Sequence, residues 1–318
     1  MNHGQQLTPR IPSGGPALTF DFPGLRIGVA EYDEGPTGCT VFDFGKRGVT
    51  AAADVRGGSP GALFHDFGFF QALCFAGGSL LGVQAATGVA AAMFGERGHE
   101  HVEWTDVPVV AGAIVFDFAR STGAFPDAAL GAAAYRAARE SLFPVGAVGA
   151  GRYTSVGKGL PGKESEPAGQ GAAIRTVGEA KVLVFTVLNS VGAILGRDGR
   201  VLRGHLDSLT GHRLRAVDQL AAGQPIAGPP GNTTLTLLLT NQKLSGRELT
   251  QLSRQVHSSM ARAIEPFHAP TDGDVLFAAT TKAVSEPALS DPSMLAALAA
   301  EVAWDAVLNV DEHAPRTR

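Results

Sequence analysis

A glycine-asparagine-threonine junction at residues 231–233 is the part of the sequence best suited to covalent chemistry. Gly231 permits the unusual backbone conformation that a peptide bond must reach before it is cut, because glycine has no Cβ. The hydroxyl of Thr233 can then attack the carbonyl carbon of Asn232 and form an ester that water hydrolyses. The cut leaves Thr233 at a new N-terminus, where its α-amine, with a reference pKa of about 7.7–8.0, can act as base for its own hydroxyl.

The segments on either side of this junction fit such chemistry. Residues 221–231 read AAGQPIAGPPG, the strongest linker composition in the chain, and residues 232–240 switch abruptly to strand composition. A core strand would hold a nucleophile rigidly. Composition alone supports self-cleavage only weakly, because Asn-Thr pairs at the start of strands are common.

Two motifs of other chemistries are matched only in part. Residues 57–61, GGSPG, follow the G-x-S-x-G nucleophile elbow, but Pro60 follows the serine and has no N–H to donate to an oxyanion. Residues 157–164 nearly match the phosphate-binding G-x-x-x-x-G-K-[ST]. Glu164 stands at the hydroxyl position of that motif, and Pro161 removes an amide. We therefore predict a glycine-rich turn at the first motif and no nucleotide site at the second.

The histidines indicate structural roles rather than catalysis. Residues 99–101, His-Glu-His, lack the HExxH spacing and a third ligand close in sequence, so we expect a solvated pair without metal. His257 and His268 are predicted to be structural hydrogen-bonding residues. Asp272-Gly273-Asp274, taken alone, is typical of a turn.

Composition and charge exclude several classes of protein. The 318 residues are 44% hydrophobic and 18% charged, which is enough to bury a large core. The net charge is -4 and no stretch combines basic with aromatic residues, so no nucleic-acid partner is predicted. Cys39 and Cys74 lie in apolar surroundings and favour a reducing compartment. The first twenty residues have no apolar signal region, and we predict a cytoplasmic protein.

Residues 67–95 could be mistaken for a membrane span, because they carry no charged residue over sufficient length. Gln71, Gln84 and Gly82 interrupt the stretch, and no basic or aromatic girdle flanks it. We predict two buried helices broken at Gly77-Gly78 and no membrane partner.

The remaining patterns predict an α+β chain with two parts, a flexible arm over residues 1–19 and one catalytic domain over residues 20–318. A Ser245-x-x-Glu248 capping box predicts a helix that ends before Pro266. Further helices are predicted over 128–142 and from Asp291-Pro292, and residues 151–171 are predicted to be a polar loop. Short runs rich in Val, Ile, Leu and Phe predict strands near residues 27–30, 39–44, 49–55, 109–118, 182–188, 232–240 and 275–280.

Several motifs together resemble one known family. GNTT at 231–234 is followed by QVHSSM at 255–260, PFH at 266–268 and DGDVLFA at 272–278. In this combination they resemble the nylon-oligomer (6-aminohexanoate-oligomer) hydrolase branch of the self-processing aminopeptidases and amidases, a family that includes the β-peptidyl aminopeptidases. The likeness covers about residues 18–310, with further matches at 20–24, 34–38, 54–58, 149–151 and 169–172.

The resemblance implies an architecture and a processing step. Thr233 matches the family's nucleophile, and Asn232 matches the residue before the cut, which would divide the chain into residues 1–232 and 233–318. The implied fold is a four-layer αββα sandwich of the N-terminal-nucleophile-hydrolase kind, and the implied assembly is a tetramer of cleaved units. The mechanism requires neither metal nor organic cofactor.

Four further residues match the family's site. Lys158 matches an active-site lysine, whose positive charge would lower the pKa of the hydroxyl. Asn189 matches an asparagine whose amide can donate to an oxyanion. Asp272 and Asp274 match an acidic pair that can orient the α-ammonium and relay protons, and two aspartates there favour the nylon-hydrolase branch.

The chain departs from that branch at Phe116, where the relatives' pattern has a tyrosine. A phenolic hydroxyl is therefore missing, although Tyr153 could compensate. The predicted activity is hydrolysis of linear amides through an acyl-enzyme on Thr233. One alternative is an aminopeptidase, β-peptidyl aminopeptidase or D-amidase with the same nucleophile. Others are an acyltransferase that passes the acyl group to an amine and a binding protein that kept only the fold.

Overall fold

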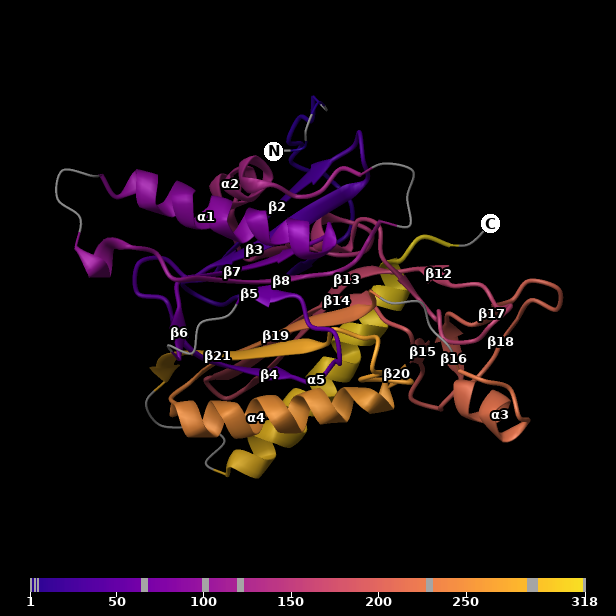
Figure 1. Ribbon diagram of the computed structural model, residues 1–318. Coiled ribbons are helices and arrows are strands. Elements are labelled where there is room, and N and C mark those ends of the chain that lie inside the picture. Colours follow the sequence, from indigo (N-terminus) through magenta and orange to yellow (C-terminus); the bar gives the residue numbers. More distant parts are fainter. Residues whose placement is uncertain are drawn as a thin grey trace.

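The computed structural model describes residues 2, 4, 6–63, 68–98, 103–118, 123–226, 231–284 and 291–316. Two six-stranded sheets form the centre of this part of the chain (Figure 1). We call them the β19 sheet, with strand order β13-β14-β19-β21-β4-β6, and the β3 sheet, with strand order β5-β8-β7-β3-β2-β9.

The β19 sheet carries the Asn232-Thr233 junction at the start of a central strand. Its members are β13 (Gly169–Val177), β14 (Ala180–Asn189), β19 (Thr233–Gln242), β21 (Val275–Val284), β4 (Val49–Val55) and β6 (Phe69–Phe70). Strand β19 is antiparallel to β14 and parallel to β21. It is buried along its whole length, as expected for a strand with neighbours on both edges.

Two helices, α4 (Gly246–Ser259) and α5 (Pro292–His313), cover the outer face of the β19 sheet (Figure 1). Helix α4 begins at the Ser245–Glu248 capping box, which the structure confirms, and buries Leu249, Leu252 and Val256. Helix α5 is capped by Asp291. By length and composition, residues 293–313 of α5 could cross a membrane. Here α5 packs on β13 and β14 as a core helix.

The β3 sheet is covered on its outer face by helices α1 (Val83–Glu96) and α2 (Ala128–Arg136). Its members are β5 (Ala62–Leu63), β8 (Val110–Ile114), β7 (Ala72–Ala76), β3 (Thr37–Asp43), β2 (Arg26–Tyr32) and β9 (Arg139–Glu140). The two helices approach very closely, since a Cβ on Gly131 would lie 2.0 Å from the carbonyl oxygen of Ala85.

The main core lies between the two sheets and is rich in phenylalanine. Phe42 of the β3 sheet meets Phe185 of the β19 sheet with ring centroids 5.1 Å apart, and Phe75 meets Phe277 at 6.2 Å. Such tilted and edge-on pairs stabilise a core beyond the area that they bury. The interlocked rings join the sheets into one unit.

Shorter elements complete the described chain. They are β1 (Ala17–Thr19), β10 (Leu142–Pro144), β11 (Ser155–Val156), β12 (Glu166–Pro167), β15 (Ala193–Leu195), β16 (Val201–Arg203), β17 (Leu206–Asp207), β18 (His212–Arg213), β20 (Ile264–Glu265), α3 (Ala216–Ala221) and the 3-10 turns η1 (Ser79–Gly82), η2 (Trp104–Asp106), η3 (Gly149–Gly151) and η4 (Met260–Arg262). Within the segment predicted to be an arm, β1 pairs with β10 and the Arg10 side chain pairs with Glu31.

The predicted strands are confirmed, except that the strand predicted over 109–118 ends at Ile114, and three other predictions need correction. The first of the two helices predicted within 67–95 is absent from the described residues 68–76, because β6 and β7 occupy this part and β7 pairs with β3 and β8. A short apolar run fits a buried strand and a buried helix equally well. The helix predicted over 128–142 ends at Arg136, and strands β9 and β10 follow. The loop predicted over 151–171 contains β11, β12 and the start of β13.

Candidate active site

Strand register brings the predicted site residues together around the start of β19. Asn189, the last residue of β14, stands directly opposite Thr233. On the other side, Asn232 pairs with Asp272 in a parallel bridge just before β21 begins. The nucleophile candidate thus lies between the asparagine candidate and the acidic pair.

The carbonyl oxygen of Asn232, on the peptide bond to Thr233, accepts from a side chain and from the backbone. The Thr233 hydroxyl donates to the Asn232 oxygen at 2.5 Å, and the Gly273 N–H donates to the same oxygen at 2.7 Å. A backbone donor placed on a carbonyl can stabilise the negative charge that develops when the carbonyl is attacked. Sequence reasoning missed Gly273 in this role, because a backbone N–H has no signature in the sequence.

Gly231 holds the chain before this bond in a left-handed conformation, with φ of 91°. A Cβ there would lie 2.7 Å from Cγ of Phe116 and 2.9 Å from its Cβ. Both the backbone angle and the aromatic ring therefore favour glycine.

We expect Gly231→Ala to slow any cleavage after Asn232 by about 10- to 100-fold, because it would displace the reacting carbonyl. The rate can be followed by densitometry of the chains on denaturing gels. Gly223→Ala is the matched control, since Gly223 has φ of 79° but no atom within 4 Å of an added Cβ. Equal rates for both variants would contradict a role of the Phe116 contact.

Lys158 and Asn189 form one hydrogen-bonded unit beside the nucleophile. Nζ of Lys158 donates to the carbonyl oxygen of Asn189 at 3.0 Å and to its Oδ1 at 2.8 Å. Burial lowers the pKa of Lys158 to about 7, although the charge of Asp272 opposes this shift. Nδ2 of Asn189 donates to the Phe116 carbonyl at 2.9 Å. In the intact chain this amide therefore anchors the pocket wall.

The acidic pair is fully buried and bound mostly by backbone amides. Asp272 accepts from the N–H groups of Val191 at 3.2 Å and Ala269 at 3.0 Å. Burial and the charge of Asp274 raise the pKa of Asp272 to about 7. Asp274 accepts from the N–H of Thr234 at 2.6 Å, so it fixes the peptide that follows the nucleophile.

The glycine-rich turn at residues 57–61 supports the acidic loop. The N–H of Ser59 donates to the Asp272 carbonyl at 2.9 Å, and that of Gly57 donates to the Asp274 carbonyl at 3.3 Å. A Cβ on Gly57 would lie 2.3 Å from the carbonyl oxygen of Asp272. The G-x-S-x-G pattern is thus a turn on which the loop rests.

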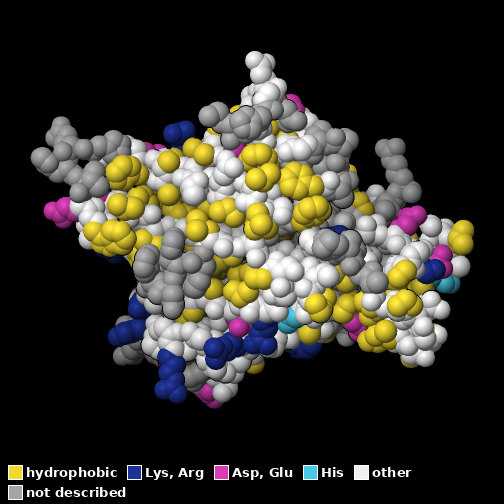
Figure 2. Space-filling model, in the orientation of Figure 1, with side chains coloured by type: hydrophobic (Ala, Val, Ile, Leu, Met, Phe, Trp, Pro, Cys, Tyr) yellow, Lys and Arg dark blue, Asp and Glu magenta, His cyan; other side chains and the backbone are white. Residues whose placement is uncertain are grey.

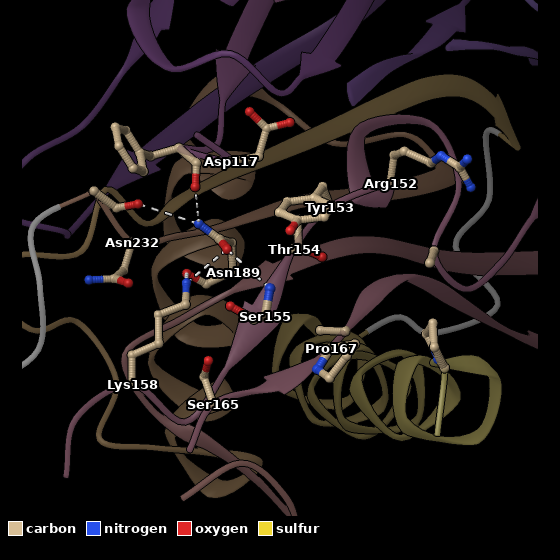
Figure 3. A pocket seen from close by; sticks show the side chains of 15 residues that line it. Asp117, Arg152, Tyr153, Thr154, Ser155, Lys158, Ser165, Pro167, Asn189 and Asn232 are labelled. Carbon is tan, nitrogen blue, oxygen red and sulfur yellow. Dashed lines mark hydrogen bonds between the residues drawn. The ribbon is translucent and has the colours of Figure 1, made fainter. Parts of the chain in front are cut away.

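A cavity of about 580 Å³ opens beside the junction (Figure 3). Lys158, Asn189 and Asn232 line it. Its other lining residues include Phe116, Asp117, Arg152, Tyr153, Thr154, Ser155, Ser165 and Pro167. A volume in this range suits a small ligand or one end of a linear chain.

Asp117 was not identified from the sequence, although it lies in the cavity wall. Its carboxylate accepts from the Thr37 hydroxyl at 2.6 Å and from the Gly78 N–H at 2.7 Å. Its neighbours in the sequence are apolar, so the run was predicted as a strand and Asp117 gave no separate signal. These neighbours are Val115, Phe116 and Phe118. The partners of Asp117 come from distant segments, which no local pattern reveals.

The other motifs take the following places. In the region of the incomplete phosphate motif, the N–H groups of Gly157 and Lys158 donate to the carbonyls of Gly192 and Val191. Residues 99–102, which include the His-Glu-His pair, and residues 227–230 of the linker lie outside the described residues. No group of three His, Cys, Asp or Glu residues that could hold a metal occurs in the described part.

Solved structures share this fold. The β-aminopeptidase of Burkholderia sp. superimposes with a TM-score of 0.69 at 18% identity, covering 97% of this chain and 91% of that chain. The L-aminopeptidase D-Ala-esterase/amidase of Ochrobactrum anthropi, described as a new variant of the Ntn hydrolase fold, superimposes with a TM-score of 0.66 at 15% identity. It covers 96% of this chain and 89% of that one. The fold is therefore that of the Ntn hydrolases.

Sequence comparison then identifies the family. The model of peptidase family S58 matches residues 17–314. The 6-aminohexanoate-oligomer endohydrolase of Agromyces sp. (strain KY5R) is 42% identical, with 96% of this chain and 89% of the relative covered. The chain belongs to peptidase family S58 and is a hydrolase of amide bonds. The resemblance seen in the motifs between residues 231 and 278 is thereby confirmed.

Proposed function

We propose that the chain is a self-processing N-terminal threonine hydrolase that cuts itself between Asn232 and Thr233 and then hydrolyses linear amides. The observation that carries the proposal is the 2.5 Å hydrogen bond from the Thr233 hydroxyl to the Asn232 carbonyl oxygen. The Gly273 N–H on the same oxygen is placed to bind an oxyanion. Attack of the hydroxyl on the carbonyl carbon would transfer the acyl group from nitrogen to oxygen.

Self-cleavage needs a base other than the Thr233 amine, because that nitrogen is still part of the peptide bond. Lys158 can take this role, since burial lowers its pKa to about 7 and part of it is neutral near pH 7. The proton of the hydroxyl would pass to the leaving nitrogen, which becomes the free α-amine. Water would then hydrolyse the ester and leave a carboxylate on Asn232.

In the cut enzyme, the α-amine of Thr233 would act as base for its own hydroxyl. The hydroxyl would attack the substrate carbonyl, the substrate amine would leave with the proton, and water would release the acyl group. Asp272 and Asp274 are proposed to hold the α-ammonium. Asn189 is proposed to donate to the oxyanion, which its place opposite Thr233 supports. No metal or organic cofactor is needed in this scheme.

The substrate is proposed to be a linear amide such as a 6-aminohexanoate oligomer. The name of the Agromyces relative supports this choice, and apolar groups of Phe116, Tyr153 and Pro167 beside the junction suit an aliphatic chain. Phe116 offers no hydroxyl to position the substrate, and Tyr153 lies in the same cavity. Activity on synthetic oligomers would be incidental to an older amide substrate.

The direct test is intact-mass spectrometry of purified protein during incubation. We expect the 32.8 kDa chain to be replaced by fragments that correspond to residues 1–232 and 233–318. Subsequent addition of 6-aminohexanoate oligomers should give shorter oligomers and a transient acyl adduct on the smaller fragment. A chain that stays intact under all conditions would contradict the proposal.

An aminopeptidase or β-aminopeptidase is the main alternative, and the β-aminopeptidase of Burkholderia sp. shares the fold. An aminopeptidase requires a free substrate N-terminus, whereas an endo-acting amidase does not. Comparing a free peptide with its N-acylated form separates the two activities. An acyltransferase would instead give a new amide when an acceptor amine is present.

A homo-oligomer, with a tetramer of cleaved units as the expected form, is also part of the proposal. Leu80, Leu81, Trp104 and Val107 are exposed. Hydrophobic side chains gather over the half of the surface in Figure 2 that holds α1, whereas Lys and Arg gather near α4.

The arrangement of helices outside two facing sheets supports the four-layer αββα description of the fold. The two buried free cysteines suit a cytoplasmic enzyme.

A further inference from the structure

Two histidines lie behind Asp274, the buried His257 and the partly buried His268, and the proposed mechanism does not use them. His257 is on α4, and His268 is in the loop before β21. Asp54 on β4 completes the cluster, because its carboxylate contacts His257. Its backbone pairs with Leu276 of β21. The sequence predicted structural hydrogen-bonding roles for both histidines, without partners.

Each imidazole has its own carboxylate. Nδ1 of His268 lies 3.0 Å from Oδ2 of Asp274, and Nδ1 of His257 lies 2.9 Å from Oδ2 of Asp54. The two rings meet edge to face, with centroids 4.3 Å apart and an interplanar angle of 83°. Nε2 of each ring has no hydrogen-bond partner within the described residues.

These contacts assign the proton positions. A carboxylate oxygen accepts, so in each contact Nδ1 of the imidazole is the donor and carries a proton. Two imidazolium ions at this separation would repel each other. His257 is completely buried, and burial lowers its pKa, although Asp54 opposes the shift. The lowered pKa favours the neutral form of His257. Its ring packs edge to face against the ring of His268, which in turn contacts Asp274.

His268 itself adopts a strained backbone conformation, with φ of 59°. Non-glycine residues rarely adopt this region unless their surroundings impose it. In this conformation the backbone N–H of His268, at 3.1 Å, and its Nδ1 both reach Oδ2 of Asp274. The other oxygen of Asp274 holds the N–H of Thr234.

We propose that His268 is a positioning residue, which clamps Asp274 through two N–H groups and thereby fixes the peptide that follows Thr233. The inference rests on the proposed function, because it concerns the rate of that self-cleavage and of amide turnover. His268 is not among the described residues that line the cavity, and its hydrogen bonds reach Asp274. Its effect passes through Asp274.

The test compares His268→Asn with His268→Gly. Asparagine tolerates positive φ and places an amide N–H close to the position of Nδ1, whereas glycine keeps the backbone conformation but removes the donor. We expect His268→Gly to lower the first-order rate of self-cleavage by about 10- to 100-fold, since small misplacements of reacting groups have effects of this size. His268→Asn should restore most of the rate. In fully processed protein, His268→Gly should lower kcat and leave KM unchanged.

Val89→Ala controls for lost stability, because Val89 is buried in α1 against the other sheet. It should lower Tm and leave both rates unchanged. If His268→Gly cleaved itself and turned over amides at wild-type rates, the proposed role of His268 would be overturned. Equal losses of rate in the Asn and Gly variants would also overturn it. If the wild-type chain itself did not cleave, the proposed function would fail instead, and the two failures are therefore distinguishable.

Discussion

Replacing Thr233 by alanine is expected to leave one uncut chain of 318 residues without amide-hydrolysing activity. The variant lacks the hydroxyl that lies 2.5 Å from the carbonyl oxygen of Asn232, and no base can compensate for a missing nucleophile. Loss of a nucleophile lowers hydrolase rates by a factor on the order of 10⁴ or more. Denaturing gels over several days and product analysis with an amide oligomer measure the two losses.

Thr233→Ser is the matched control for this experiment, because it keeps the hydroxyl and removes only a methyl group. It should still yield two chains, at a rate that is compared directly with the rate of the threonine enzyme. Cleavage in the alanine variant, at this or another bond, would show that a different residue attacks. The threonine would then have to be assigned a structural role at the start of β19.

The second large effect is expected at Lys158. Because the pKa of Lys158 is lowered to about 7, its neutral form increases as the pH rises through that value. If neutral lysine accepts the hydroxyl proton, the rate of self-cleavage should rise with pH around 7 and then level off. Lys158→Met should lower this rate by about 10²- to 10⁴-fold, the usual contribution of a general base. Freshly refolded chain, sampled at a series of pH values, provides the measurement.

Lys158→Arg distinguishes two roles of Lys158, that of a general base and that of a simple cation, which the family resemblance implied. A guanidinium keeps its charge at all of these pH values and cannot accept a proton. The base role predicts that the arginine variant is as slow as the methionine variant. A fast arginine variant, together with a wild-type rate that falls as pH rises, would show that Lys158 acts through its charge. Asp272→Asn tests whether Asp272, whose pKa is also about 7, contributes to the profile.

Local patterns predicted the elements that carry the site, because those elements depend on neighbouring residues. The Ser245–Glu248 capping box lies within one helical turn, and the linker-to-strand change at residue 232 marks the start of β19. The apolar run before Gly77 was predicted as helix, because only its pairing with β3 and β8 decides that it is a strand. Its partners are distant in the sequence.

The candidate site divides in the same way. Side chains with distinctive chemistry, such as Lys158 and Asp274, could be matched to a family pattern. The donor on the scissile carbonyl is the backbone N–H of Gly273, and the clamp on Asp274 is His268 in a left-handed conformation. Neither a backbone N–H nor a backbone angle is encoded by a recognisable residue type. Both depend on how the 57–61 turn and α4 pack around the acidic loop.

The central place of β19 has a consequence for denaturation. A cut after Asn232 would put β19, α4, β21 and α5 on one polypeptide and β14 and β4, the strands that flank the β19–β21 pair, on the other. The uncut chain would refold as a single molecule, whereas the cut enzyme would have to reassemble from two, so its refolding would depend on concentration. Long-term persistence of the cut enzyme would then be set by the height of its unfolding barrier rather than by an equilibrium.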